Sequence, residues 1–183
     1  MSNSLKIYEA VREQMKTGDC ISFASNDLLG KLIRIWSKGS NHIESILCLS
    51  KYAGKENRIW SLGARSGGID LNILSNLIKN YNGQVTWYPV KDEFDWYRET
   101  VVCKGLKVAG TPYDFEGLFA NVFGRISMAA KKFLCSKFWY WLWMKGADEE
   151  YPNGVLPKVE KVPRPGDIIK DPWKIFKTPM RLA

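Results

Sequence analysis

The chain has 183 residues, of which 45% are hydrophobic and 25% are charged, and these ordinary globular values exclude an intrinsically disordered chain. Its length suits one compact domain, so we expect a single domain over residues 1–183. The longest unbroken apolar run, Phe138 to Met144, is far shorter than the roughly 20 residues of a membrane-spanning helix. The N-terminus lacks the pattern of a signal peptide. We therefore expect a cytoplasmic protein, with release to the envelope by a phage or lysis route as an alternative.

Basic residues outnumber acidic residues by 27 to 19, which gives the chain a net charge of +8. This balance suits an anionic partner such as nucleic acid, an anionic envelope polymer or an acidic membrane surface. The basic residues are scattered along the chain, and the longest local run is two. We therefore expect general attraction to anions and no specific nucleic-acid binding, with a basic nucleic-acid-binding domain as the lesser hypothesis.

Hydrophobic periodicity predicts helices at both ends of the chain around three or four antiparallel strands, which is an α+β fold. The expected elements of the first part are a helix over 4–15, a strand over 20–24, a helix over 27–37, and strands over 42–50 and 58–62. The expected elements of the rest are a glycine-rich turn over 63–68, a segment over 69–80 that ends as a helix, a strand over 84–90, a helix over 92–109 and a largely helical stretch over 115–146. Asp27 is the expected N-cap of the second helix.

The last 33 residues differ in composition from the rest of the chain, because they hold six of the eight prolines. Proline cannot join a central strand or a helix interior. We therefore expect residues 151–183 to form an extended arm that packs on a core of about residues 16–150.

Four cysteines and a single histidine limit the chemistry that the chain can carry. The cysteines form no CxxC pair and one histidine cannot complete a zinc-finger pattern, so we expect neither a metal site nor a disulfide framework. A cysteine nucleophile needs a base or a positive field, because the thiolate is the reactive form and the ordinary thiol pKa is near 8.5. An imidazole base in this chain must be His42.

Cys135 differs from the other cysteines in its position within the expected elements. We expect the other three to lie inside strands or a helix and to be buried and unreactive (Cys20, Cys48 and Cys103). If a helix begins just before Cys135, the thiol faces the positive end of the helix dipole. If that helix begins near Ser127, the advantage is absent, and the sequence is compatible with either start.

Several short motifs, in their order along the chain, resemble one family of enzymes. The motifs are Thr17-Gly18-Asp19-Cys20-Ile21-Ser22-Phe23, Gly30-Lys31-Leu32-Ile33-Arg34, Ser40-Asn41-His42-Ile43, Gly110-Thr111-Pro112-Tyr113-Asp114-Phe115, Phe133-Leu134-Cys135-Ser136 and Ile168-Ile169-Lys170-Asp171-Pro172-Trp173. They resemble the circularly permuted NlpC-type papain-like cysteine peptidases and amidases of the YiiX/YaeF-like group, distantly related to lecithin:retinol acyltransferase. The resemblance covers about residues 16–175. It implies a papain-like fold with a small antiparallel sheet or barrel flanked by helices, in which the nucleophile helix is C-terminal.

The resemblance also implies roles for individual residues. It makes Cys135 the nucleophile, His42 the general base and Tyr113 a residue that lines the site beside the cysteine. The family's third polar residue, often Glu, falls on Ser61, whose hydroxyl can accept the ring N–H but brings no charge. Glu44 shares the His42 face of its strand, since side chains repeat every second residue, and it is the second candidate for orienting the ring.

These residues predict a cysteine hydrolase that cleaves amide bonds of peptide type through a Cys135–His42 thiolate–imidazolium pair and needs no cofactor. The resemblance implies substrates of cell-wall peptide type or lipid-linked acyl groups. The alternative is a degenerate family member that binds such a ligand without turning it over, and Ser61 in place of a carboxylate is the main support for that alternative.

Overall fold

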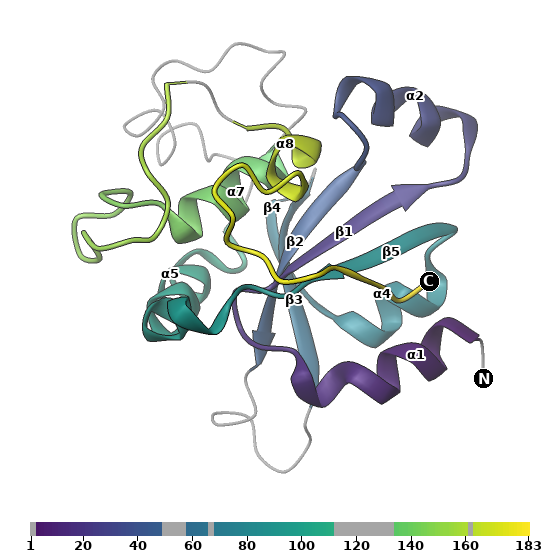
Figure 1. Cartoon of the computed structure of the whole chain (residues 1–183), viewed down its shortest axis with the longest axis horizontal. Coiled ribbons are helices and arrows are strands. Elements are labelled where there is room, and N and C mark those ends of the chain that lie inside the picture. The colour runs from purple at the N-terminus through teal and green to yellow at the C-terminus, as the bar shows by residue number, and fades with distance from the viewer. Residues whose placement is uncertain (1–2, 49–57, 66–67, 112–133, 161–162) are drawn as a thin grey trace.

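A six-stranded antiparallel sheet forms the centre of the molecule, with strand order β4-β3-β2-β1-β5-β6 (Figure 1). The computed structural model describes residues 3–48, 58–65, 68–111, 134–160 and 163–183. The strands are β1 (Cys20–Ser25), β2 (His42–Cys48), β3 (Ile59–Arg65), β4 (Gly68–Ile73), β5 (Gly83–Tyr88) and β6 (Met180–Arg181). Neighbouring strands along the chain thus pair mostly with each other, and the C-terminus returns to the edge at β5.

Helices cover both faces of the sheet. The α-helices are α1 (Asn3–Val11), α2 (Leu28–Trp36), α4 (Leu74–Asn80), α5 (Arg98–Val108), α7 (Leu134–Trp143) and α8 (Pro165–Ile169), and the 3-10 helices are η1 (Arg12–Gln14) and η2 (Asp92–Tyr97). Figure 1 shows α5, α7 and α8 on one side of the sheet and α1 and α4 on the other. Within the described segments, no helix has the length and apolar character that crossing a membrane requires.

The alternation of side chains along β2 divides the core into two clusters. Ile43 and Leu47 belong to the cluster that contains α5 and α7, whereas Ile46 belongs to the cluster that contains α1 and α4. Successive residues of a strand point to opposite faces, so His42 and Glu44 share the periodicity of Ile46. The strand that carries the histidine is thus fixed by apolar packing on both of its faces.

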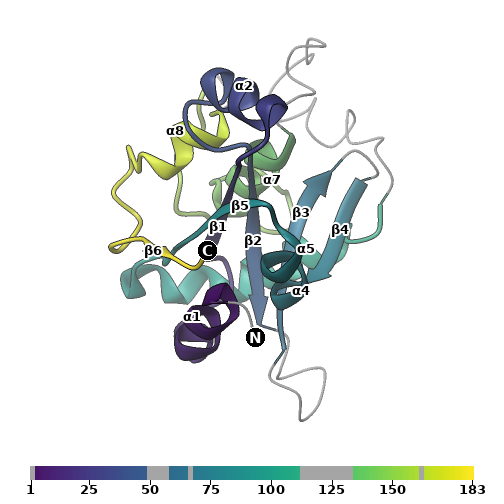
Figure 2. The same ribbon diagram turned by 90° about the vertical axis from the view of Figure 1, so that its right-hand side faces the viewer.

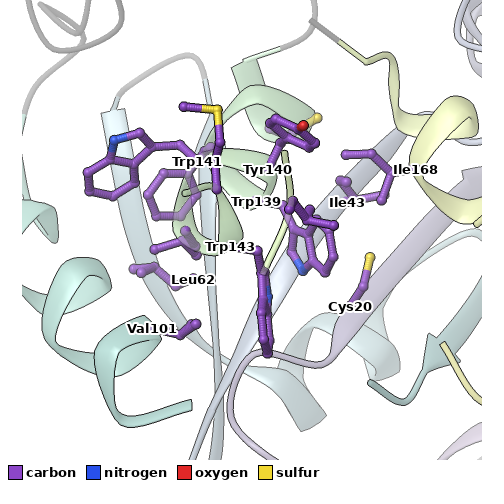
Figure 3. Packing of buried hydrophobic residues seen from close by; sticks show 14 of the residues in the cluster. Cys20, Ile43, Leu62, Val101, Trp139, Tyr140, Trp141, Trp143 and Ile168 are labelled. Atoms are coloured by element: carbon purple, nitrogen blue, oxygen red, sulfur yellow. The ribbon is translucent and has the colours of Figure 1, made fainter. Parts of the chain in front are cut away.

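The cluster on the α7 side is dominated by aromatic side chains (Figure 3). Trp139, Tyr140, Trp141 and Trp143 are fully buried. The indole N–H of Trp143 donates to the carbonyl of Gly18 over 3.1 Å, so the polar atom of this side chain is satisfied within the core. This packing holds α7, and with it Cys135, against β2 and β3.

The predicted strands and helices are largely confirmed, with three corrections. The sheet has six strands and not three or four, because 68–73 and 180–181 are additional strands. Gly63 lies inside β3, which continues to Arg65, and is not in a turn. The helix predicted over 92–109 is a 3-10 helix followed by α5 from Arg98. The helical stretch predicted over 115–146 is described only from residue 134 onward.

The described parts of the proline-rich C-terminal segment lie along the core. It forms α8, and the amide of Lys177 donates to the carbonyl of Pro89 over 2.8 Å. The amide of Leu182 likewise donates to the carbonyl of Val85 over 2.8 Å. Its end is nevertheless a strand, because β6 pairs with β5 through Thr86 and Trp87.

Candidate active site

The first part of the site is a histidine–carboxylate pair on one strand. His42 and Glu44 stand two residues apart on β2, and His42 Nε2 lies 2.8 Å from Glu44 Oε1. Glu44 is fully buried, whereas the His42 side chain keeps 24% of its surface exposed. The carboxylate therefore supports the imidazole from the interior and leaves part of the ring facing outward.

Strand β3 holds the Glu44 carboxylate in place. The Ser61 hydroxyl donates to Oε2, and Arg65 donates to Oε1 through Nε over 2.9 Å and Nη2 over 2.5 Å. Gly63 lies between these two residues, and a Cβ atom there would come within 2.5 Å of Glu44 Cγ. Ser61, Gly63 and Arg65 thus alternate along one face of β3 and supply two donors and the space that Glu44 occupies.

This environment keeps Glu44 ionised despite its burial. Burial alone raises the pKa of a carboxyl group, but His42, Arg65 and Ser61 favour the charged form. Their combined effect lowers the Glu44 pKa to about 2. A fixed negative charge therefore lies behind the imidazole throughout the neutral pH range.

The second part of the site comes from α7. The Cys135 thiol is hydrogen-bonded to the His42 side chain and also to the backbone amides of Ile43 and Ser136. Burial raises the thiol pKa, but the charge and hydrogen bond of His42 outweigh this effect, so the Cys135 pKa lies below its ordinary value. The residues that precede α7 are outside the described segments, so the predicted dependence of Cys135 on the helix start stays a prediction.

His42 responds in the opposite direction. Burial alone lowers the imidazole pKa, but the adjoining Cys135 sulfur and Glu44 carboxylate raise it, to about 10. A lowered thiol pKa beside a raised imidazole pKa is the signature of a thiolate–imidazolium pair. Cys135, His42 and Glu44 are thus linked in series, and the interactions along the series favour the charged form of each group.

The structure brings together four of the five residues singled out in the sequence, with one rearrangement. Glu44, and not Ser61, contacts the imidazole, while the Ser61 hydroxyl bonds to Glu44. The expectation that Ser61 accepts the ring N–H is therefore wrong for this geometry. Tyr113 lies outside the described residues. Arg65 was missed, because interpreting 63–68 as a turn hid the alternation of Ser61, Gly63 and Arg65.

The remaining cysteines differ from one another more than their predicted positions suggested. All four cysteines are free thiols, and Cys20 is buried with a raised pKa. Burial also raises the pKa of the half-buried Cys48 to about 11. Cys103 is exposed, which corrects the prediction that it is buried: it lies on the solvent side of α5, while Val101 and Val102 face the core.

A cavity of about 370 Å³ lies beside the imidazole. Its lining combines aromatic and apolar groups with amides and one cation, namely Phe23, His42, Arg65, Asn76, Leu77, Asn80 and Tyr81. The Phe23 ring stands 6.0 Å from the His42 ring, between centroids. The site therefore has an adjoining hollow with both apolar and hydrogen-bonding surface.

Within the described segments, no group of three His, Cys, Asp or Glu side chains is arranged to hold a metal ion.

Comparison with known proteins gives a distant likeness among solved structures. The sequence matches no protein-family model and no curated protein. Among solved structures, the chain is similar to the crystal structure of the metalloprotein yiiX from Escherichia coli O157:H7, with a TM-score of 0.45 and 16% sequence identity. The match covers 69% of this chain and 66% of that one, so this chain spans just under two thirds of its length. Because identity and TM-score are both low, nothing about activity follows from this neighbour, and the NlpC-type permutation stays a prediction.

Proposed function

We propose that the protein is a cysteine hydrolase that cleaves amide bonds of peptide type. The observation that carries the proposal is the chain of contacts from the Cys135 thiol through the His42 imidazole to the buried Glu44 carboxylate. A thiol with a lowered pKa, a base in hydrogen-bond contact and a third group that orients the base are the parts of a cysteine nucleophile site.

The proposed reaction uses the chain's own residues and water. The Cys135 thiolate attacks the carbonyl carbon, a C–S bond forms, and the carbonyl electrons move to an oxygen that backbone N–H groups near Cys135 stabilise. With Nε2 held by Glu44, the other ring nitrogen of His42 gives its proton to the leaving amine, the C–N bond breaks and a thioester remains. Water then loses a proton to His42 and attacks the thioester, which releases the acid and restores the ion pair.

The substrate classes implied by the sequence are cell-wall peptides and lipid-linked acyl groups. The cavity beside His42 offers apolar and hydrogen-bonding surface for part of such a substrate, because Phe23, Leu77 and Tyr81 line it together with Asn76 and Asn80. Cys135 is not among its lining residues, so the cavity would hold a part of the substrate away from the scissile bond. Thioester or ester acyl transfer is the chemical relative of this reaction, since it shares the acylated cysteine.

The competing function is a binding module without turnover. The sequence supported the binding module because Ser61 stands where the family often has a carboxylate. Glu44 supplies that carboxylate from β2, and Ser61 and Arg65 hold it in place. The arrangement therefore favours a competent pair, and thiol reactivity separates the two functions.

The test is the pH dependence of iodoacetamide labelling at Cys135, followed by peptide mass mapping. The exposed Cys103 would react through accessibility alone, so the measurement uses a Cys103→Ser background. We expect Cys135 to be labelled at a lower pH than an ordinary thiol, because the charge and hydrogen bond of His42 hold the Cys135 pKa below its ordinary value. His42→Ala removes the counter-charge and leaves the effect of burial, so the thiol pKa should rise and neutral labelling should be lost.

Two further variants divide the roles of the supporting residues. Glu44→Gln should raise the Cys135 pKa clearly, whereas Ser61→Ala should raise it slightly, because Ser61 acts only through Glu44. A labelling profile whose midpoint lies at or above pH 8.5, and which His42→Ala leaves unchanged, would favour the binding module.

Acetylation by p-nitrophenyl acetate is a direct readout of the proposed reaction. The reagent should acetylate Cys135 in the parent protein, and water should then remove the acetyl group. No acetyl-enzyme should form in Cys135→Ala.

A further inference from the structure

Helix α2 exposes the side chains that a soluble domain normally buries. Six of its nine residues are large apolar side chains, and all six are exposed: Leu28, Leu29, Leu32, Ile33, Ile35 and Trp36. Leu28 is 81% exposed and Trp36 is 75% exposed. Among the described residues, these six make up most of the ten exposed large hydrophobic side chains. A contiguous patch of this kind marks an interaction surface.

The helix is attached to the domain by its small and polar side. Gly30 is its buried residue, and a Cβ atom there would clash with the Cβ of Ser25. The side-chain amide of Asn41 donates to the Gly30 carbonyl over 2.7 Å and accepts from the Ser25 amide over 2.7 Å. The six apolar side chains form one arc of the helix surface, called the apolar arc below. This arc points away from the core, which is the reverse of the usual orientation of an amphipathic helix.

Contacts at both ends of α2 fix this outward orientation of its apolar arc. Asp27 caps the N-terminus by accepting from the Gly30 amide over 2.5 Å. At the C-terminal end, the Gly166 amide of α8 donates to the Ser37 carbonyl over 2.8 Å, and Arg164 donates to the Trp36 carbonyl over 3.0 Å. Figure 2 shows α2 at the upper edge of the molecule beside α8. The apolar arc is thus presented by a helix held firmly at the periphery.

The charges around α2 are mainly positive. The segment and the residues bonded to it carry four cations and two carboxylates, namely Lys31, Arg34, Lys38, Arg164, Asp27 and Asp167. Lys31 lies on the helix at the edge of the apolar arc, whereas Arg34 lies on the opposite side of the helix, toward Gly30, since each residue advances by 100°. The whole chain also carries a net charge of +8. A second copy would bring these cations against one another, whereas an anionic surface complements them.

We propose that α2 docks the protein on an anionic lipid bilayer, with its leucine, isoleucine and tryptophan side chains in the headgroup–acyl boundary and Lys31 at the phosphates. A short helix with Leu and Trp on one face and Lys or Arg beside them lies in the interface plane and does not span the bilayer. The turn after α2 leads directly into His42, so docking places that end of β2 at the lipid surface. The inference stands independently of the proposed hydrolase.

The experiment is flotation of the full chain with large vesicles, either of phosphatidylcholine alone or of phosphatidylcholine with phosphatidylglycerol. We expect binding to the phosphatidylglycerol vesicles that weakens as salt is added. Leu28→Gln with Leu32→Gln should reduce the partition coefficient by roughly tenfold or more. Lys31→Gln should reduce it by about fivefold.

A matched control distinguishes binding through α2 from nonspecific binding through other exposed apolar side chains. Ile7→Gln with Leu106→Gln changes two apolar side chains that are 37% and 42% exposed on α1 and α5, and it should leave binding unchanged. Because Leu28 and Leu32 are exposed, their variants should keep the parent's thermal unfolding midpoint. Equal binding to neutral vesicles, or binding that the α2 variants do not reduce, overturns the proposal. A lipid-free dimer that Leu28→Gln with Leu32→Gln dissociates in sedimentation velocity would overturn it in favour of a second copy.

Discussion

Helices α2 and α7 have similar compositions and opposite surroundings. The sequence of α2 is LLGKLIRIW and that of α7 is LCSKFWYWLW, so each is rich in large apolar residues and each holds a lysine. In α7 the tryptophans, Ser136 and Lys137 are buried, whereas in α2 the apolar residues are exposed. Composition alone therefore does not decide which of two apolar helices joins the core.

The difference depends on what covers each helix. Helix α7 lies between β2 and β3 on one side and the C-terminal segment on the other, where the Leu156 amide donates to the Trp143 carbonyl over 2.9 Å and Trp173 packs on Tyr140. Helix α2 contacts β1 through Gly30, and among the described segments its partners meet its polar side. Helix α7 is thus covered on both sides within the core. Helix α2 is attached to the domain by contacts of its backbone and leaves its apolar side chains exposed.

The largest expected effect comes from truncating one tryptophan in each helix. Trp143→Ala removes a fully buried side chain and its bond to Gly18, and it should lower the free energy of unfolding by about 3–5 kcal/mol. Trp36→Ala removes a side chain that is exposed, and in the absence of lipid it should change stability by less than about 0.5 kcal/mol. Urea unfolding of both variants measures the contrast. Equal losses would mean that α2 is covered in solution.

A smaller effect is expected from the two lysines. Lys137 is buried and, among the described residues, its Nζ has no hydrogen-bond partner, and burial lowers its pKa to about 8. The unfolded chain binds this proton more tightly, so the charge destabilises the fold most below pH 8. Lys137→Met should therefore raise stability by about 2 kcal/mol at neutral pH.

The pH dependence checks the cause of that gain. As pH rises from about 8 toward about 10.5, the native state is neutral at Lys137 while the unfolded state is still charged, so the parent gains stability and the advantage of Lys137→Met shrinks. Lys104 also has a pKa lowered by burial, to about 8, and it is present in both proteins, so the difference isolates Lys137. Lys31→Met should show no such gain. An advantage of Lys137→Met that is constant over this range would refute the assignment.

Much of the fold follows from local pattern. Alternation predicted β1 and β2 to within one or two residues, and Asp27 was identified as the cap of α2 because a carboxylate before an apolar helix accepts its free N–H groups. The β3–β4 pairing was not predicted, because the glycines at 63, 67 and 68 favoured a turn over residues 63–68. Gly63 is accommodated here because Glu44 fills the space beside it, a contact between strands that local pattern does not contain.

The sequence predicted Cys135, His42, Glu44 and Ser61 as members of the candidate site, but it predicted neither Arg65 nor the contacts among these residues. His42 followed from being the sole histidine, and Cys135 from the motif around it. Whether Glu44 or Ser61 holds the imidazole depends on side-chain geometry across β2 and β3, which two-residue periodicity leaves open. The exposure of α2 could not be predicted either. An apolar arc in a sequence indicates a buried face, and the pattern is the same when the arc faces solvent.

The smallest expected effect concerns Gly30, the point at which α2 meets β1. Gly→Ala at an exposed interior position of a helix normally stabilises it, by up to about 1 kcal/mol. Here the added methyl would clash with the Ser25 side chain and stretch the Asn41 bond to the Gly30 carbonyl, so Gly30→Ala should lower stability by about 1–2 kcal/mol. Lys31→Ala is the matched control on the exposed side and should change stability little. Thermal unfolding measures both. A stabilised Gly30→Ala would mean that α2 stands free of β1 in solution, and that the backbone contact does not orient its apolar arc.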